Sequence, residues 1–210
     1  MMASKVLYIL DPGHGGMING RYQTNGKFSP KFDDGSILYE GVNNRDNVRI
    51  IRNSLNEIGL DSVDIVDSEL DIPLRERVNK ANELAKTRKC LYISIHSDAA
   101  GDASNWHPAQ GISVFTSIGQ TKSDVFATIL IDELQNQFGN TVKWRTDLSD
   151  KDEDKEENFF VLRETSCPAV LIEAGFHTNK QEALRMLTDE WKDKLSAAVA
   201  YACQKWEKIA

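Results

Sequence analysis

The sequence predicts an α/β fold, a single domain with a mostly parallel, twisted sheet and helices on both faces. The chain has 210 residues, of which 40% are hydrophobic and 27% charged, and these values are typical of one globular domain. Short apolar runs rich in β-branched residues alternate with longer amphipathic segments along the whole chain. Strands and helices that alternate in this way are joined by right-handed crossovers, which make the strands parallel.

Five apolar runs are expected to form the strands of the sheet. In chain order they are 5–10 (KVLYIL), 62–66 (SVDIV), 90–95 (CLYISI), 111–116 (GISVFT) and 169–173 (AVLIE). Most of these runs are apolar at nearly every position, rather than at every second one. This pattern indicates strands that are covered on both faces, as in a parallel sheet between two layers of helices.

Four longer segments have the spacing of amphipathic helices, namely 41–58, 73–88, 123–138 and 189–207. In the first of them, Val48, Ile51 and Leu55 fall on one face of the helix. Asn179 with Glu182 three residues later resembles a capping box, which predicts the start of a further short helix.

Two stretches do not follow the strand and helix pattern. Residues 17–39 are polar and rich in glycine, and form a long loop between the first strand and the first helix. Loops of this length are uncommon in compact domains and are often functional. Residues 146–158 (TDLSDKDEDKEEN) contain many charged side chains in succession. We expect this segment to be a solvated, mobile loop.

The net charge and the cysteine positions argue against a nucleic-acid-binding protein and against a fold held by disulfides or by a cysteine zinc site. A formal net charge of −7 argues against nucleic acid as a partner, because phosphate binding needs a basic face. The three cysteines, Cys90, Cys167 and Cys203, have neither a disulfide framework nor the spacing of a cysteine zinc site. We interpret Cys90 and Cys203 as small buried side chains.

The N-terminal segment carries a short apolar run before the first turn. That run is too short for the core of a signal peptide, and no run approaches the roughly 20 residues of a membrane span. We therefore expect cytoplasmic synthesis without a signal peptide and without membrane insertion. A substrate outside the membrane would then require another component, such as a pore, to release the protein.

Four side chains that can bind a metal or transfer a proton lie next to the expected strands. His14 follows the first strand by four residues, His96 ends the run LYISIH, and Glu173 ends the run AVLIE. Glu40 lies at the start of the first expected helix, after the long loop that leaves the first strand. Functional groups of open α/β sheets gather beyond the carboxyl ends of the strands. We therefore predict that these four side chains meet at one edge of the sheet.

Each of these residues also has a structural explanation when taken alone. His14 could belong to a tight Gly/Pro turn, and His96 could be a hydrogen-bonded histidine of the core. Glu173 is harder to explain, because a carboxylate after an apolar run is costly to bury without a metal or a base as partner. The four residues together favour a functional site.

Two imidazoles and one carboxylate are the ligand set of a hydrolytic zinc site, with water in the fourth position. Zinc lowers the pKa of that water and polarises a carbonyl, and a second carboxylate can accept the proton and pass it to a leaving amine. The residue types leave open which of Glu40 and Glu173 takes which role. We leave His107 and His177 outside the metal shell, since a fourth protein ligand would close the water position, and expect both near the rim of the site.

Five blocks of the sequence resemble the zinc-dependent N-acetylmuramoyl-L-alanine amidases of type 3, which cleave bacterial peptidoglycan. They are LDPGHGG at 10–16, YEGVNNRDNVRIIRNSL at 39–55, LRERVNKANE at 74–83, YISIHSDAA at 92–100 and VLRETSCPAVLIEAGFHTN at 161–179. The blocks follow the order of the family and span most of the chain. The loop that contains GKFSPKFDDGS is similar to the phage and prophage endolysin branch of the family.

The resemblance implies one zinc ion held by His14, Glu40 and His96, with Glu173 as the catalytic carboxylate. It further implies hydrolysis of the amide between N-acetylmuramic acid and the L-alanine of the stem peptide, with bacterial peptidoglycan as partner. The sequence departs from the family at His177, where an aliphatic residue is usual, and we expect this side chain to influence the rim of the cleft.

Further expectations concern substrate binding and organisation. The loop at 17–39 is expected to form a wall of the substrate groove. Arg163, near the carboxyl end of the run FFVLR, is a candidate for pairing with a carboxylate of the stem peptide. We expect residues 1–210 to be one catalytic domain, without a separate wall-binding domain, and the protein to be a monomer. A phage enzyme would be released through a membrane pore, whereas a host enzyme would need a signal.

Two other functions are compatible with the same residues. The first is a different zinc amidohydrolase or peptidase on a similar sheet. The second is a non-catalytic wall-binding module that kept the fold, and the intact Glu173 argues against it.

Overall fold

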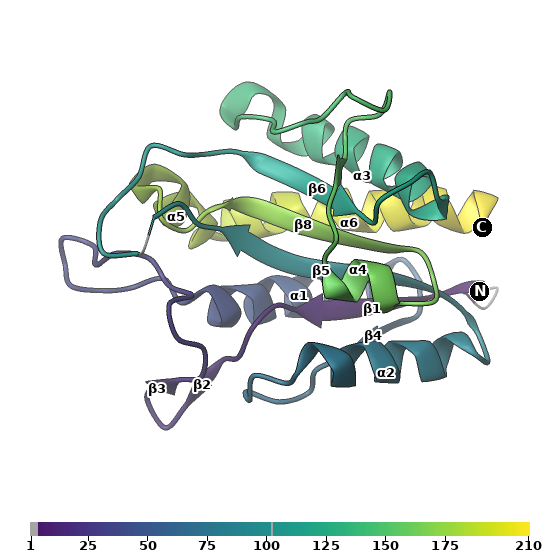
Figure 1. The fold of residues 1–210 in the computed structure, drawn as a ribbon, viewed down its shortest axis with the longest axis horizontal. Coiled ribbons are helices and arrows are strands. Elements are labelled where there is room, and N and C mark those ends of the chain that lie inside the picture. Colours follow the sequence, from purple (N-terminus) through teal and green to yellow (C-terminus); the bar gives the residue numbers. More distant parts are fainter. Residues whose placement is uncertain (1–3, 102) are drawn as a thin grey trace.

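The computed structural model describes residues 4–101 and 103–210 and confirms the predicted α/β fold. Six strands form one sheet in the order β4-β1-β5-β8-β6-β7 (Figure 1). Their bounds are Val6–Pro12 (β1), Ser62–Asp64 (β4), Lys89–Asp98 (β5), Ile112–Thr116 (β6), Lys155–Glu156 (β7) and Ala169–Phe176 (β8). All five predicted strands are present.

The sheet is mostly parallel, as predicted. β4, β1, β5 and β8 run in the same direction, β6 is antiparallel to β8, and β7 is parallel to β6. The carboxyl ends of β1, β5 and β8 therefore meet at one edge, and the arrowheads of β1 and β5 point to it on the left of Figure 1. Functional groups of an open α/β sheet are expected at this edge.

Helices cover both faces of the sheet. One face carries α1 (Glu40–Glu57), α3 (Lys122–Phe138) and α6 (Asp189–Ile209), and the other carries α2 (Leu74–Ala85) and α4 (Phe160–Glu164). Alternate residues of β1 serve the two layers, with Tyr8 and Leu10 in one apolar cluster and Leu7 and Ile9 in the other. This alternation explains the unbroken apolar runs of the sequence. Within the described residues, none of the helices has the length and apolar character needed to cross a bilayer.

The remaining elements are short. The predicted short helix is α5 (Lys180–Met186), whose N-cap Asn179 accepts hydrogen bonds from two backbone N–H groups of its first turn. The run FFVLR lies at helix α4, and a 3₁₀ helix η1 (Gly139–Thr141) follows α3. The long loop at 17–39 contains a small hairpin of β2 (Met17–Ile18) and β3 (Arg21–Tyr22).

The charge run at 146–158 differs from the prediction. Part of it is β7, whose Lys155 and Glu156 pair with the edge strand β6, and Asp154 beside it is only 1% exposed. The prediction of a solvated loop is therefore wrong for this part of the run. The prediction failed because the charge of a segment does not determine whether its backbone pairs with an unpaired strand at the side of a sheet.

The cysteines provide a prediction about reactivity. Cys90 and Cys203 are buried, as predicted, and Cys167 is partly buried. Burial raises the pKa of Cys167 to about 12 and also raises the pKa values of the other two thiols. Because the thiolate is the reactive form, we expect iodoacetamide at about pH 8 to leave all three unmodified in the folded protein. Mass spectrometry checks this, with the urea-unfolded chain as control, and rapid labelling of a native thiol would contradict it.

Candidate metal centre

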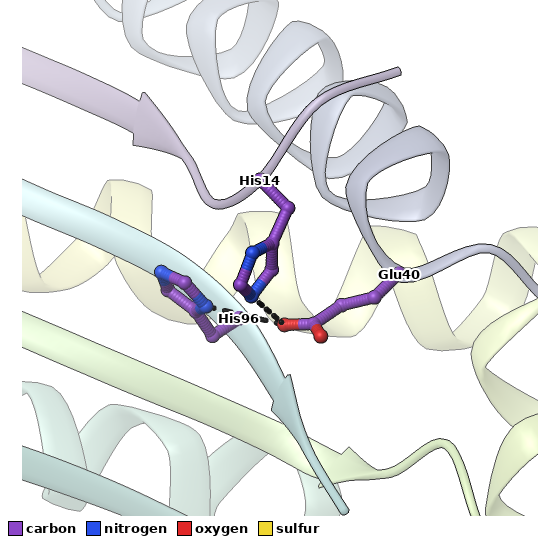
Figure 2. Close-up of side chains that lie close together, drawn as sticks. All are labelled: His14, Glu40 and His96. Carbon is purple, nitrogen blue, oxygen red and sulfur yellow. Dashed lines mark hydrogen bonds and ion pairs between the residues drawn. The ribbon is translucent and has the colours of Figure 1, made fainter. Parts of the chain in front are cut away.

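Three of the four predicted site residues converge at the carboxyl edge of the sheet. His14 follows β1, His96 lies near the end of β5, and Glu40 is the first residue of α1. Figure 2 shows the two imidazole rings and the carboxylate pointing at one another. Oε1 of Glu40 lies 3.3 Å from Nε2 of His14 and 3.1 Å from Nδ1 of His96.

The turn after β1 holds His14 in an uncommon backbone conformation. Its φ is 66°, in the left-handed region that residues other than glycine seldom adopt. Two guanidinium groups fix this turn by donating to the His14 carbonyl, Arg45 at 2.9 Å and Arg77 at 3.1 Å. Backbone strain of this kind is frequent at functional sites, where the surrounding structure maintains it.

Glu40 is almost completely buried, with an exposed fraction of 1%. Its Oε1 also accepts a hydrogen bond of 3.1 Å from the backbone N–H of Ser97. Burial alone would raise the pKa of Glu40, but hydrogen bonds from His14 and His96 outweigh it and hold the pKa well below its usual value. The carboxylate is therefore ionised and available as a ligand.

Two glycines permit the close packing around these side chains. A Cβ at Gly13 would lie 2.2 Å from Cε1 of His96, and a Cβ at Gly41 would lie 1.9 Å from the carbonyl oxygen of Gly15. Any side chain at Gly13 would displace the His96 ring, and any at Gly41 would separate α1 from the turn after β1. The contact at Gly13 thus explains a glycine that the sequence alone attributes to a tight turn.

The donor set fits a zinc ion. The ligand atoms of His14, Glu40 and His96 all lie within 4.8 Å of one another. Donors of one tetrahedral zinc lie about 3.3 Å apart, since each bond to nitrogen or oxygen is about 2.0–2.1 Å long. The distances of 3.1 and 3.3 Å from Glu40 match this spacing. Oε2 of Glu40 is buried and has no hydrogen-bond donor, which leaves the carboxylate with unused acceptor capacity.

Glu173 lies beside this group on β8. It is the register partner of His96 in β5 and of Ser113 in β6, so it occupies the middle of the same edge. Its Oε2 is buried without a hydrogen-bond partner. Burial raises the pKa of Glu173 well above its usual value, and the negative charges of Glu40 and Asp98 raise it further. This carboxyl group is therefore suited to hold and release a proton.

Two basic residues near Glu173, Lys27 and Arg145, are not among the site residues that the sequence predicts. The guanidinium of Arg145 donates to Asp98 at 2.5 Å and lies 4.7 Å from the centre of the Phe176 ring. Positive charge on Lys27 and on Arg145 acts to lower the pKa of Glu173. Lys27 lies in the long loop and Arg145 in an irregular segment, and only the folded chain brings them to this edge.

His177 lies behind the cluster and not at its rim. It is fully buried, its Nδ1 lies 3.1 Å from the Ser97 carbonyl, and the same nitrogen is 3.8 Å from Oε2 of Glu40. Because a carbonyl can only accept, Nδ1 carries the proton of a neutral ring, and burial lowers the pKa of His177. The expectation that this side chain influences the cleft rim is therefore wrong, since β8 continues to Phe176 and carries His177 into the interior.

The other two candidates make local contacts. The guanidinium of Arg163 donates to Asn158 and Glu164 and packs over Phe160, and none of these contacts joins it to the cluster. His107 is exposed, and its Nδ1 accepts a hydrogen bond from the backbone N–H of Ala109. His107 is not part of the group formed by His14, Glu40 and His96.

Comparison with known proteins places the chain in a family. A family model described as N-acetylmuramoyl-L-alanine amidase matches residues 9–205. The chain is 27% identical over 191 residues to the amidase LytC of Bacillus subtilis, and covers 33% of that protein's length, about a third. It is also 27% identical over 229 residues to AmiA of Salmonella typhimurium, where 94% of this chain aligns with 74% of the relative.

Solved structures agree on the fold. An N-acetylmuramoyl-L-alanine amidase from Clostridium difficile 630 superposes with a TM-score of 0.78 at 24% identity, with 97% of each chain covered. The amidase Ami1 of Mycobacterium smegmatis gives a TM-score of 0.76 at 20% identity, with 99% of each chain covered. The family model spans nearly the whole chain and contains all four residues at the carboxyl edge. The protein therefore belongs to the N-acetylmuramoyl-L-alanine amidase family of type 3.

Proposed function

We propose that this protein is a zinc-dependent amidase of bacterial peptidoglycan. The bond cleaved is the amide between the lactyl group of N-acetylmuramic acid and the L-alanine of the stem peptide. The observation that carries the proposal is the group of His14, Glu40 and His96 beside Glu173, in a chain that belongs to this family. The short distances within the group and the unpartnered carboxylate oxygens support a metal-assisted hydrolysis.

In this proposal His14, Glu40 and His96 hold the zinc ion. Bound zinc would polarise the carbonyl of the scissile amide and favour deprotonation of the attacking water. The chain contributes the rigidity of the site. Ser97 fixes Glu40 through its backbone N–H, and the two arginines on the His14 carbonyl fix the turn that aims the imidazole. Such supporting contacts orient the ligands before the metal binds.

Glu173 has the role of proton carrier. Its unpartnered Oε2 accepts the proton of the attacking water and then delivers it to the nitrogen of the departing alanine. Burial beside the negative charges of Glu40 and Asp98 favours the protonated form of Glu173, which supports the second of these steps. The surroundings of the two glutamates support this division of roles, because Glu40 contacts two imidazoles and Glu173 does not.

The substrate groove is bordered by the loop at 17–39. A pocket of about 480 Å³ lies between this loop and the segment 103–106, and it is lined by Phe28, Pro30 and Trp106 among others. The same loop is joined to the start of α1, because the backbone N–H of Glu40 donates to the Lys27 carbonyl. A substrate carboxylate near Glu173 would meet the positive charges of Lys27 and Arg145 before it could meet Arg163.

Analysis of the reaction products tests this function. Digestion of purified cell walls is expected to release free alanine amino groups and muramic acid lactyl carboxyl groups together, in equal amounts. A different zinc peptidase would release amino groups without new lactyl carboxyl groups, and a wall-binding module would release neither. Either of these two results would refute the proposed bond specificity.

Substitution of Gly13 tests whether His96 belongs to the metal site. In Gly13→Ala the new Cβ pushes the His96 ring out of place, because the two would otherwise lie 2.2 Å apart. We expect zinc affinity to fall by about 10- to 100-fold, the usual range for loss of a contact that orients a ligand. Competition with a chromogenic zinc chelator measures this change. An unchanged affinity in a folded variant would show that the ring does not bind the metal.

A further inference from the structure

A second group of carboxylates lies at the other end of the sheet. Asp124 belongs to the first turn of α3, and Asp152 and Asp154 precede β7. One ligand atom from each lies within 4.8 Å of those of the others. The group surrounds Thr116 at the carboxyl end of β6, and β6 runs antiparallel to β8. It is therefore separate from the edge that carries the candidate metal centre.

Two members of the acidic group are buried, Asp152 is partly buried, and the group lacks positive partners among the described residues. Asp154 is 1% exposed and Asp124 is 4% exposed. Oδ1 of Asp154 and Oδ1 of Asp152 are both buried atoms without a hydrogen-bond donor. No lysine or arginine in residues 4–101 and 103–210 forms an ion pair with any of the three carboxylates. Burying several unpaired carboxylates together is costly unless a cation or a shared proton compensates them, and burial with the charges of Asp152 and Asp124 raises the pKa of Asp154 to about 7.

Neighbouring hydrogen-bond donors satisfy only some of the oxygens of these three carboxylates. The Thr116 hydroxyl lies 2.6 Å from Oδ2 of Asp154 and 3.1 Å from Oδ1 of Asp124, but it has one proton for the two carboxylates. Oδ2 of Asp124 accepts a hydrogen bond from the backbone N–H of Thr121 in the capping box of α3. The side-chain amide of Gln120 donates to Oδ2 of Asp152 at 3.1 Å. The Oδ1 atoms of Asp152 and Asp154 remain without a donor.

The geometry suits a hard divalent cation. All candidate ligands are oxygens, which excludes a preference for zinc and favours calcium or magnesium. Calcium–oxygen bonds of about 2.3–2.6 Å place opposite ligands about 5 Å apart, so one ion can reach atoms that lie within 4.8 Å of one another. Calcium also accepts irregular sets of one- and two-oxygen carboxylate ligands, whereas magnesium requires a near-ideal octahedron.

The sequence around this group has a further feature of calcium-binding loops. Asp150, Asp152 and Asp154 occupy every second position, which is also the spacing of the first three acidic ligands in such loops. The glycine that normally follows is replaced by Lys155, and Asp124 comes from a distant helix. The segment is therefore not an EF-hand, and its ligands are collected from two parts of the chain.

We propose that Asp124, Asp152 and Asp154 bind one calcium ion. The ion would fasten the segment 146–157 to the side of the sheet that is formed by strand β6. The segment begins directly after Arg145, whose guanidinium contacts Asp98 near Glu173. Calcium binding therefore stabilises the fold and keeps the start of this segment in place beside the candidate metal centre. The proposal does not depend on the amidase activity, because the two sites share no residue.

Thermal unfolding with calcium alone tests the proposal. Zinc-loaded protein in calcium-free buffer is titrated with CaCl₂, and at a hundredfold excess over Kd we expect Tm to rise by about 5–10 °C. Asp154→Asn and Asp152→Asn are expected to lose this rise. Without calcium, Asp154→Asn should be at least as stable as the wild type, because it removes a buried charge from the group. Trypsin cleavage after the exposed Lys151 should become slower with calcium in the wild type, but not in Asp154→Asn or Asp152→Asn.

Two control variants make the outcome specific. Asp147→Asn makes the same change in the same charged run but outside the group, and should keep the full calcium response. His96→Ala should also keep it, which separates this site from the candidate zinc site. The proposal is overturned by an unchanged wild-type Tm at millimolar calcium, by a rise that persists in both Asp154→Asn and Asp152→Asn, or by a larger response to MgCl₂ than to CaCl₂.

Discussion

Glu173→Gln is expected to lower the rate of peptidoglycan amide hydrolysis by about 10²- to 10⁴-fold, the usual contribution of general acid–base catalysis. The substitution keeps the shape of the side chain but removes its capacity to accept and release a proton at Oε2. Because Glu173 is not among the three residues of the candidate metal centre, zinc content should stay unchanged. The initial rate of amino-group release from purified cell walls measures the effect, with zinc measured on the same preparation.

The matched control for this prediction is Glu164→Gln on α4. Glu164 is 43% exposed and pairs with Arg163, so the same substitution there should leave the rate of hydrolysis within experimental error of the wild type. A Glu173→Gln enzyme with full activity and full zinc content would exclude Glu173 as the proton carrier.

Arg77→Ala is expected to reduce the free energy of unfolding by about 3–5 kcal/mol, which is the usual cost of breaking a buried ion pair. Arg77 is 1% exposed, and its Nη1 lies 2.6 Å from Oδ1 of Asp11, which is equally buried. The same guanidinium donates to the carbonyls of Pro12 and His14. Its removal leaves the Asp11 charge uncompensated and the His14 turn without one of its supports. Urea unfolding measures the loss of stability.

Arg75→Ala on the same helix is the control for this prediction. Arg75 is exposed and contacts the Phe160 ring at 5.3 Å, an interaction worth about 0.5–1 kcal/mol. Arg77→Lys should recover only part of the lost stability, because an ammonium group cannot reproduce the fork that reaches Asp11 and three backbone carbonyls. Equal losses for the two alanine variants would show that the buried pair has no special role.

Much of the fold follows from local sequence patterns. The runs at 5–10 and 90–95 are apolar at nearly every position because each residue packs against one of two helical layers. The order of the strands in the sheet does not follow from such patterns, since it depends on which crossovers pass over which face. The pairing of β7 with β6 was missed for a related reason. A strand of two residues in a highly charged segment has no local sequence pattern that predicts it. Its position is determined by the otherwise unpaired side of β6.

The candidate site was predictable where its residues follow strand ends. His14, His96 and Glu173 were found in this way, because the carboxyl ends of parallel strands share an edge. The residue types left the roles of Glu40 and Glu173 open and the family resemblance implied their division, with which the two imidazoles beside Glu40 agree. Arg145 could not be found from the sequence, because it reaches Asp98 across the fold from an irregular segment. The burial of His177 could not be predicted either, because it depends on where β8 ends and therefore on which way the next residue points.

Metal analysis of the wild type and of His96→Ala tests the central claim most directly. The wild type purified with zinc in the buffer is expected to contain about one zinc ion per chain. His96→Ala should lose most of this zinc after dialysis, together with the hydrolysis of purified cell walls, while circular dichroism shows the same fold. If His96→Ala retains zinc at the wild-type level, His14, Glu40 and His96 do not form the metal site.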